Sequence, residues 1–153
     1  MDAIPRRAAR VLLVDGDDRV LMFRGFDPAR PDHRYWFTPG GGLDGDEAYA
    51  VGAARELAEE TGLRLTPDEL GAPVWDEVTV YPFDGQLYRQ HQEFFLVRVP
   101  AWEVDTGGFD EMERDSIDGH RWWEVADLES TTEKIYPDDL AGLLRRVLEV
   151  ETC

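Results

Sequence analysis

Three glutamates are spaced so that a helix would bring their carboxylates together. Glu56, Glu59 and Glu60 stand at positions i, i+3 and i+4 of a segment with helical hydrophobic spacing. These spacings share one helix face, so the negative charges repel one another by roughly 0.2–0.5 kcal/mol per pair. A divalent cation would relieve this repulsion, and clustered carboxylate oxygens suit Mg²⁺ or Mn²⁺. Arg55 adjoins this face and is placed to hold one carboxylate by a bidentate contact.

The same spacing is also typical of a solvated acidic helix face, which is common in an acidic protein. The residues before the helical segment favour the metal interpretation. Pro39 is followed by three consecutive glycines, Gly40 to Gly42, just ahead of the helix. A glycine turn lets the backbone approach a phosphate or a metal closely, and a helix N-terminus favours anions. Turn, helix, carboxylates and arginine together predict a site for phosphate and metal.

The helices that must position these residues follow from the spacing of apolar side chains. Apolar residues recur at helical intervals over residues 46–61, with Asp44 or Asp46 as candidate N-cap and Gly62 as the expected stop. A second helix is expected from Pro137, because proline suits the first helical position. The apolar stripe of this second helix comprises Leu140, Leu143, Leu144, Val147 and Leu148. Such a stripe predicts a packing helix without chemistry of its own.

Short apolar-rich segments predict the strands. They cover residues 7–14, 19–24, 35–37, 74–83, 87–99 and 120–125. Asp-Gly dipeptides at residues 15–16 and 84–85 predict turns between consecutive strands. Residues 25–34 are expected to form a loop, either at the entrance of a substrate site or as a tolerated insertion, and residues 107–118 an irregular acidic segment. Strands interleaved with two helices predict an α/β protein with a mixed sheet.

Composition limits the classes of function. The 153 residues suffice for one domain spanning residues 1–153, and 16 basic against 33 acidic residues leave a net charge of −17. Such a chain is unsuited to nucleic acid duplexes or anionic membranes, which both attract positive charge. A chain of this charge can still bind a polyanion if a divalent cation lies between the two. No apolar run of membrane-spanning length and no signal-peptide pattern is present, and Cys153 is the single cysteine, so a cytoplasmic location is expected.

The segment from Gly41 to Leu63 resembles the complete Nudix box, G-x5-E-x7-R-E-U-x-E-E-x-G-U, where U is aliphatic. Every fixed position of this pattern is matched, and the flanking residues 36–42 and 121–123 also look like the family. The resemblance implies the Nudix fold, an α/β/α sandwich with a mixed sheet. It also implies Mg²⁺-dependent hydrolysis, with Mn²⁺ as an alternative, of a nucleoside diphosphate linked to another moiety.

The resemblance further implies which residues bind the metal. The late glutamates of the box are metal ligands in the family, which here are Glu56, Glu59 and Glu60. A backbone carbonyl of the glycine turn, at Gly40 or Gly41, is an expected additional ligand.

Other positions acquire catalytic or supporting roles by the same resemblance. Arg55 is expected to orient a metal-binding glutamate, and Glu47 to support either the arginine or a metal, although a helical projection places Glu47 away from the other carboxylates. Family members often carry a further catalytic glutamate after the box, for which Glu113 is the first candidate, Glu111 the second and Glu93 the third. Surface charge is the alternative for each. The implied catalytic residues are Glu59, Arg55, Glu47 and Glu113.

Signals for substrate binding are weaker. The candidates for phosphate contacts are Arg24, Arg34, Arg89 and His91, and those for stacking a base are Trp36, Tyr81 and Phe83. Core packing is the alternative for the aromatic residues. The expected partner is a small nucleotide-type molecule, with ADP-ribose, dinucleoside polyphosphates and nucleoside triphosphates all left open.

Two other kinds of protein share this fold and are alternatives. A non-catalytic Nudix sensor of a nucleotide metabolite usually loses box glutamates, which this chain keeps. Isopentenyl diphosphate isomerase needs a catalytic cysteine inside the domain, whereas Cys153 is terminal. A homodimer is also conceivable, and Trp75, Trp102 and Trp122 are candidates for either an interface or the core.

Overall fold

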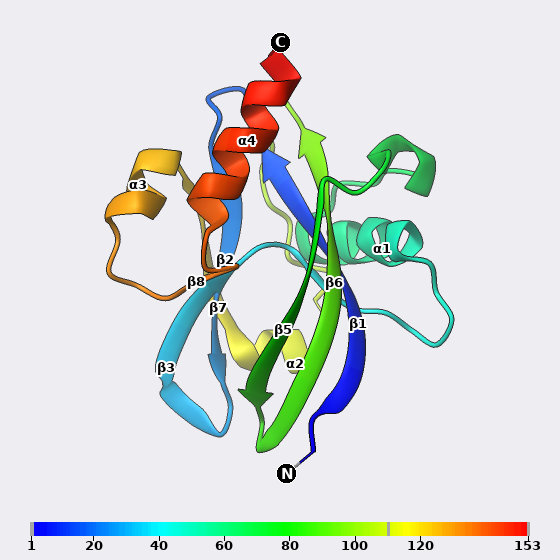
Figure 1. The fold of residues 1–153 in the computed structure, drawn as a ribbon, viewed down its shortest axis with the longest axis vertical. Coiled ribbons are helices and arrows are strands. Elements are labelled where there is room, and N and C mark those ends of the chain that lie inside the picture. The colour runs from blue at the N-terminus through cyan, green and yellow to red at the C-terminus, as the bar shows by residue number, and fades with distance from the viewer. Residues whose placement is uncertain (1, 110, 153) are drawn as a thin grey trace.

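The computed structural model describes residues 2–109 and 111–152, so Asp110 of the acidic segment and the single cysteine, Cys153, lie outside the described residues. Figure 1 shows the arrangement of its elements. In chain order they are β1 (Ile4–Val14), β2 (Val20–Asp27), β3 (Arg30–Phe37), β4 (Gly40–Gly42), α1 (Tyr49–Thr61), the 3₁₀ turn η1 (Pro67–Leu70), β5 (Trp75–Phe83), β6 (Gln86–Arg98), α2 (Glu111–Ser116), β7 (Ile117–Trp123), α3 (Val125–Ser130), β8 (Ile135–Tyr136) and α4 (Leu140–Thr152).

The strands form one mixed sheet in the order β5-β6-β1-β2-β3-β8, with β4 paired to β1 and β7 paired to β2. β1 runs parallel to β6 from Ile4 opposite Tyr88 to Val14 opposite Arg98, whereas most other pairs are antiparallel. β1 meets β2 only at Val14 and Val20, and farther back it pairs with the short strand β4. The sheet therefore splays apart between β1 and β2, and the glycine turn enters this opening.

Two hydrophobic clusters cover opposite faces of the sheet. On one face, α1 contributes Ala53, Ala54 and Leu57 to a cluster with Leu13 and Phe95. On the other face, α3 and α4 pack on the sheet through Leu128, Leu140, Leu143, Leu144 and Val147. In Figure 1, α1 accordingly lies to the right of β1 and β6, while α3 lies on the left. The predicted α/β class and the α/β/α sandwich with a mixed sheet are confirmed.

The helix that carries the box begins later than its hydrophobic spacing predicts. α1 starts at Tyr49, and its N-cap is Ala48, which makes no side-chain capping bond, so neither Asp44 nor Asp46 is the cap. The three residues before it are held in a turn by the bond from the Glu47 amide to the Asp44 carbonyl (2.9 Å). At the other end the prediction is confirmed, because Gly62 ends the helix with a φ of 79° that glycine adopts without strain.

The segment expected to be a loop at residues 25–34 is mostly strand. β2 continues to Asp27 and β3 starts at Arg30, so only Pro28 and Ala29 connect them. The Asp27 carboxylate stabilises this tight turn by accepting a bond from the Ala29 amide (2.9 Å). Most side chains of this part of β3 are exposed, and their polar composition therefore resembles that of a loop.

Other predicted boundaries also shift. The segment expected to be irregular contains α2, and α4 begins at Leu140 after a turn in which the Leu140 amide donates to the Pro137 carbonyl (3.1 Å). Of the tryptophans proposed for an interface, Trp102 donates to the Thr61 carbonyl (2.8 Å) and Trp122 packs on the α1 side. Trp75 is 40% exposed, with the Arg146 guanidinium 5.0 Å above its ring.

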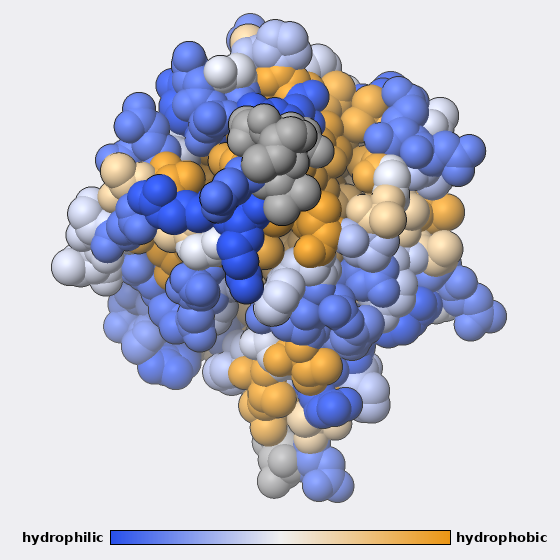
Figure 2. Space-filling view, turned by 45° about the horizontal axis from the view of Figure 1, so that its top comes forward, coloured by the Kyte–Doolittle hydropathy of each residue, from blue (hydrophilic) through white to orange (hydrophobic). Residues whose placement is uncertain are grey.

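Polar residues make up much of the visible surface (Figure 2). Figure 2 shows one face on which hydrophilic residues predominate and hydrophobic residues form smaller groups. Among the helices of the described residues, none combines the length and the apolar character needed to span a bilayer.

Candidate active site

The glycine turn needs glycine at consecutive positions. Gly40 has a φ of 137°, and a Cβ atom there would collide with the Ala9 carbonyl of the neighbouring strand β1. A Cβ atom on Gly41 would lie 2.8 Å from a carboxylate oxygen of Glu56. The turn therefore packs against α1 with no room for side chains, which holds its backbone beside the box carboxylates.

Glu60 is the most deeply buried carboxylate of the box. Its side chain is only 1% exposed, and one carboxylate oxygen accepts a bond from the Gly40 amide at 2.6 Å. Burial, the hydrogen bond with Glu113 and the negative charge of Glu56 hold the pKa of Glu60 well above its usual range. Glu60 thus connects the helix to the glycine turn, in an environment that favours its protonated form.

Arg55 organises the other carboxylates. It binds Glu47 in a bidentate manner, through Nε at 2.9 Å and Nη2 at 2.8 Å. Its Nη1 reaches Glu56 at 3.0 Å and Glu59 at 3.4 Å, and its Nη2 also donates to the Gly42 carbonyl at 3.2 Å. The bond between Arg55 and Glu47 lowers the pKa of Glu47 and raises that of Arg55, so both stay charged.

The position of Glu47 follows from the late start of α1. The projection that placed it away from the other carboxylates assumed that residue 47 was helical, but the helix begins at Tyr49. Glu47 instead belongs to the preceding turn, where its carboxylate also accepts a bond from the Asp44 amide (3.1 Å). The turn directs Glu47 toward Arg55, which is the supporting role that the resemblance offered as one of two alternatives.

Glu113 reaches the box from a distant part of the chain. It lies on α2, and carboxylate oxygens of Glu56, Glu59 and Glu113 all fall within 4.8 Å of one another. Burial raises the pKa of Glu56 to about 7, and the charge of Glu113 adds to this effect while Arg55 opposes it. Three oxygen donors at this spacing, unfavourable as a bare anionic cluster, suit a hard divalent cation such as Mg²⁺ or Mn²⁺.

The other candidates for the additional glutamate lie outside this cluster. Glu111 is exposed at the start of α2. Glu93 lies on β6, where it is paired with Ala9 and Asp76.

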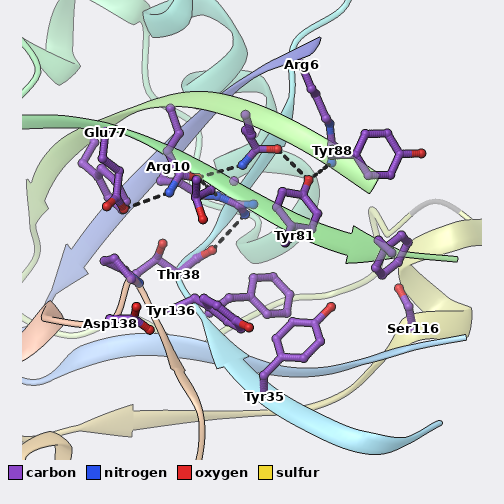
Figure 3. Close-up of a pocket in the computed structure, with 18 of the residues that line it drawn as sticks. Arg6, Arg10, Tyr35, Thr38, Glu77, Tyr81, Tyr88, Ser116, Tyr136 and Asp138 are labelled. Carbon is purple, nitrogen blue, oxygen red and sulfur yellow. Dashed lines mark hydrogen bonds between the residues drawn. The ribbon is translucent and has the colours of Figure 1, made fainter. Parts of the chain in front are cut away.

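A cavity of about 530 Å³ adjoins the carboxylates. Glu60 and Glu113 line it together with an aromatic set, which consists of Tyr35, Phe37, Tyr81, Phe83, Phe94, Tyr88 and Tyr136. Figure 3 shows Tyr35 and Tyr136 facing Arg10 and Tyr81 across the cavity. A volume of this size and a mixed aromatic and polar lining are typical of sites for small organic ligands.

The structure brings only some of the proposed substrate residues to this cavity. Tyr81 and Phe83 line it. Trp36 does not, because it is 7% exposed and packs edge-on against Trp123 in the core, with ring centroids 5.1 Å apart. Core packing, the alternative weighed for the aromatic residues, therefore describes Trp36.

The proposed phosphate-binding residues also lie elsewhere. Arg24 pairs with Asp118 at 2.8 Å, and Arg34 pairs with the same carboxylate. Arg89 is exposed on β6 and is not part of the cavity lining. His91 contacts the Tyr49 hydroxyl at 2.7 Å, away from the cavity.

Sequence reasoning missed two arginines that do line the cavity, Arg6 and Arg10. A signal for them was present, since they stand at i and i+4 of a strand and therefore point to the same face as Ala8 between them. Tyr35 and Tyr136 were missed as well. They approach each other at 5.5 Å only because β8 pairs with β3, which local spacing does not reveal.

The raised pKa values predict an unusual pH dependence for the metal-free protein. A folded state that binds more protons than the unfolded chain loses stability as pH rises. Here the loss extends from about 4.5 toward about 7, the raised pKa of Glu56. In EDTA, Glu60→Gln is therefore expected to raise the thermal midpoint at pH 7.5 but not at pH 4.5. A gain is expected because the glutamine keeps the Gly40 contact and is neutral without binding a proton.

Thermal unfolding of the wild type and of Glu60→Gln at the two pH values measures this effect. Glu103→Gln is the matched control, because Glu103 is exposed. An equal change in stability at both pH values would show that proton binding by Glu60 does not limit the stability of the metal-free fold, and would contradict the prediction.

A family model described as the NUDIX domain matches residues 4–146. An RNA pyrophosphohydrolase of Novosphingobium aromaticivorans is 28% identical over 158 residues, covering 93% of this chain and 86% of that protein. An m7GpppN-mRNA hydrolase of Danio rerio is 37% identical over 75 residues, covering 47% of this chain and 24% of that protein. The MutT protein from Methanosarcina mazei Go1 superposes with a TM-score of 0.71 at 16% identity, covering 100% of this chain and 99% of that one.

These similarities differ in what they show. At 16% identity the superposition shows a shared fold, and the chain spans about a quarter of the Danio rerio protein, 24% of its length. The family match covers nearly the whole chain and contains the glycine turn, the box helix and Glu113. The protein belongs to the Nudix hydrolase family.

Proposed function

We propose that the protein is a divalent-metal-dependent diphosphate hydrolase that cleaves a nucleoside diphosphate linked to another moiety. The observation that carries this proposal is the convergence of Glu56, Glu59 and Glu113 oxygens within 4.8 Å of one another. This cluster borders a cavity of about 530 Å³ with aromatic walls, so metal ligands and a space for a nucleoside are adjacent.

The carboxylates of Glu56, Glu59 and Glu60 are proposed to hold Mg²⁺, with the carbonyl of Gly40 or Gly41 as a further ligand and Glu113 beside them. When bound, the cation would neutralise the diphosphate and lower the pKa of a water molecule. The protein supplies the alignment. Arg55 fixes the directions of the Glu56 and Glu59 carboxylates by bonds of 3.0 and 3.4 Å, and Glu47 fixes Arg55 in turn.

Proton transfer is assigned to Glu113. Its carboxylate is hydrogen-bonded to Glu60, the buried group whose pKa is raised. Glu113 is only partly buried and lines the cavity, so it is accessible to a water molecule beside the substrate. It accepts the proton of the water whose oxygen bonds to one phosphorus, while the P–O bond of the diphosphate breaks and the other phosphate leaves with its moiety. Glu60 stabilises the position of Glu113 through their shared bond.

The substrate is proposed to be a nucleotide-type molecule. ADP-ribose, dinucleoside polyphosphates and nucleoside triphosphates each contain a base for the aromatic cavity and a diphosphate for the carboxylate cluster. The relative from Novosphingobium aromaticivorans is named an RNA pyrophosphohydrolase, so RNA that carries a pyrophosphate is a further candidate substrate. The net charge of −17 disfavours long duplexes, which need positive protein surface.

A substrate panel tests the proposal. Phosphate or nucleotide release is expected from at least one compound in Mg²⁺ or Mn²⁺ and is expected to disappear in EDTA. The panel contains ADP-ribose, dinucleoside polyphosphates, nucleoside triphosphates, nucleotide sugars and 5′-triphosphorylated RNA. Absence of turnover with every compound and both metals would contradict a hydrolase, and tight nucleotide binding without turnover would support a sensor instead.

A further inference from the structure

Arg6 and Arg10 point into the cavity from the same face of β1 (Figure 3). The Arg6 Nη1 donates to the Tyr81 hydroxyl at 2.6 Å. The Arg10 Nε contacts the Gln92 carbonyl oxygen and its Nη1 the Thr38 carbonyl, both at 3.4 Å. All three acceptors are neutral, and among the ion pairs formed within residues 2–109 and 111–152 none includes either arginine.

Two guanidinium groups without a carboxylate partner are costly in a partly buried cavity. Burial lowers the pKa of Arg10, and the nearby charge of Arg6 lowers it further. Tyr81, Glu60 and Glu56 oppose this shift from a distance, without an ion pair to the guanidinium. Acidic side chains are abundant in a chain with 33 of them, yet none pairs with these two arginines in the described structure. The arrangement is favourable if an external anion enters between them.

Arg6 also connects the cavity to the carboxylate cluster. It lines a second hollow together with Gly42, Glu56 and Glu59. A Cβ atom on Gly42 would lie 2.7 Å from the Arg6 Nη2, so the guanidinium packs directly on the glycine turn. An anion that contacts Arg6 is therefore beside both the aromatic cavity and the proposed metal ligands.

A buried chain of hydrogen bonds sets the direction of both arginines. Glu77 accepts from the Gln92 amide at 3.0 Å, and the Gln92 carbonyl oxygen accepts from the Gln90 amide at 2.8 Å. The Gln90 carbonyl oxygen then accepts from the Tyr81 hydroxyl at 2.7 Å. Because a carboxylate only accepts, Glu77 orients the whole chain, leaving the Tyr81 oxygen as acceptor for Arg6 and the Gln92 oxygen as acceptor for Arg10.

Two members of this hydrogen-bonded chain are buried amides, which apolar packing would not require. Gln90 and Gln92 are 1% and 6% exposed, and buried amides are stable only when their partners are present. Their bonds end on the two arginines and on Glu77, which also lines the cavity. Their effect is to present two fixed cationic groups toward the cavity.

We infer that Arg6 and Arg10 form an anion site that binds the nucleotide phosphates between the aromatic cavity and the carboxylate cluster, with Tyr81 as the residue that positions Arg6. The substrate class that follows is a nucleotide whose base enters the aromatic cavity lined by Tyr35 and Tyr136 and whose phosphate chain contacts Arg6. The identity of the substrate rests on the proposed function, whereas the anion site itself does not.

Calorimetric titration with ADP and with adenosine, both in EDTA, tests the anion site without any turnover. Arg6→Met and Arg10→Met are each expected to weaken ADP binding at least about tenfold, the cost of losing one charge-assisted contact. Adenosine binding is expected to stay within about twofold, because the aromatic walls remain. Arg98→Met is the matched control, since it removes an arginine of β6 that pairs with Asp18 and does not line the cavity.

Tyr81→Phe separates positioning from packing, because the ring stays and only the hydroxyl is lost. ADP binding is expected to weaken about three- to tenfold, with adenosine unaffected. On whichever substrate is turned over, KM is expected to rise while kcat changes little.

The outcomes distinguish the two proposals. ADP binding that is absent in the wild type, unchanged in both arginine variants, or lost in parallel with adenosine binding would overturn the anion site, even if hydrolysis is found. ADP binding that depends on Arg6 and Arg10 in a protein without turnover would support the anion site and refute the hydrolase.

Discussion

Glu59→Gln is expected to lower kcat/KM by about 10²- to 10⁴-fold while the protein stays folded. The physical reason is that glutamine keeps the size of the side chain but removes the negative charge that a divalent cation requires. Glu59 suits this test because its side chain is 37% exposed, so its replacement leaves no buried group without a partner. The apparent Mg²⁺ concentration needed for half-maximal activity is expected to rise at least about tenfold.

Steady-state kinetics across a Mg²⁺ titration measures both quantities, on the substrate that the panel identifies. Glu103→Gln is the matched control, since Glu103 is exposed and the exchange has the same effect on net charge. Activity of Glu59→Gln within about threefold of the wild type at every Mg²⁺ concentration would exclude Glu59 from the metal site.

Arg55→Lys is expected to cost about 2–4 kcal/mol of folding stability and most of the activity. Lysine keeps the charge but cannot make the bidentate bonds to Glu47 or reach Glu56 and the Gly42 carbonyl at the same time. For a domain of this size the loss corresponds to a lowering of the thermal midpoint by roughly 4–16 °C. Activity falls because the Glu56 and Glu59 carboxylates lose the group that orients them.

The pH dependence of this loss provides an internal check. The bond from Arg55 lowers the pKa of Glu47, so the stability that their pair contributes is present above the ordinary glutamate pKa and disappears as pH falls through the lowered value. The difference between wild type and Arg55→Lys is therefore expected to shrink in acid. Thermal unfolding from pH 7.5 downward, with Arg98→Lys as control, measures it, and a difference that grows in acid would contradict this account of the pair.

The behaviour of Glu47 illustrates where sequence reasoning succeeds and where it fails. Its resemblance to the early glutamate of the box implied a supporting role, toward either the arginine or a metal. Its geometry was not predictable from helical spacing, because the first helical residue is Tyr49 and helix ends are poorly encoded when no capping side chain marks them. The same limitation affected the hairpin at β2 and β3, whose exposed polar side chains hide the strand pattern.

The local chemistry of the site was determined by the sequence itself. A spacing of i, i+3 and i+4 places Glu56, Glu59 and Glu60 on one helix face whatever the helix packs against, and consecutive glycines permit the close turn before it. The predicted α/β class is confirmed for the same reason, since alternating and helical hydrophobic patterns are local properties.

The tertiary structure alone decided which distant residues complete the site. Glu113 joins the carboxylates because α2 folds back toward the box, and Arg6, Arg10 and Tyr81 meet because β1 pairs with β6 and β6 with β5 in one particular register. Shifting either register by one residue would turn these side chains to the opposite face. Register depends on the packing of the whole sheet between its two helical layers, and no local spacing in the chain contains that information.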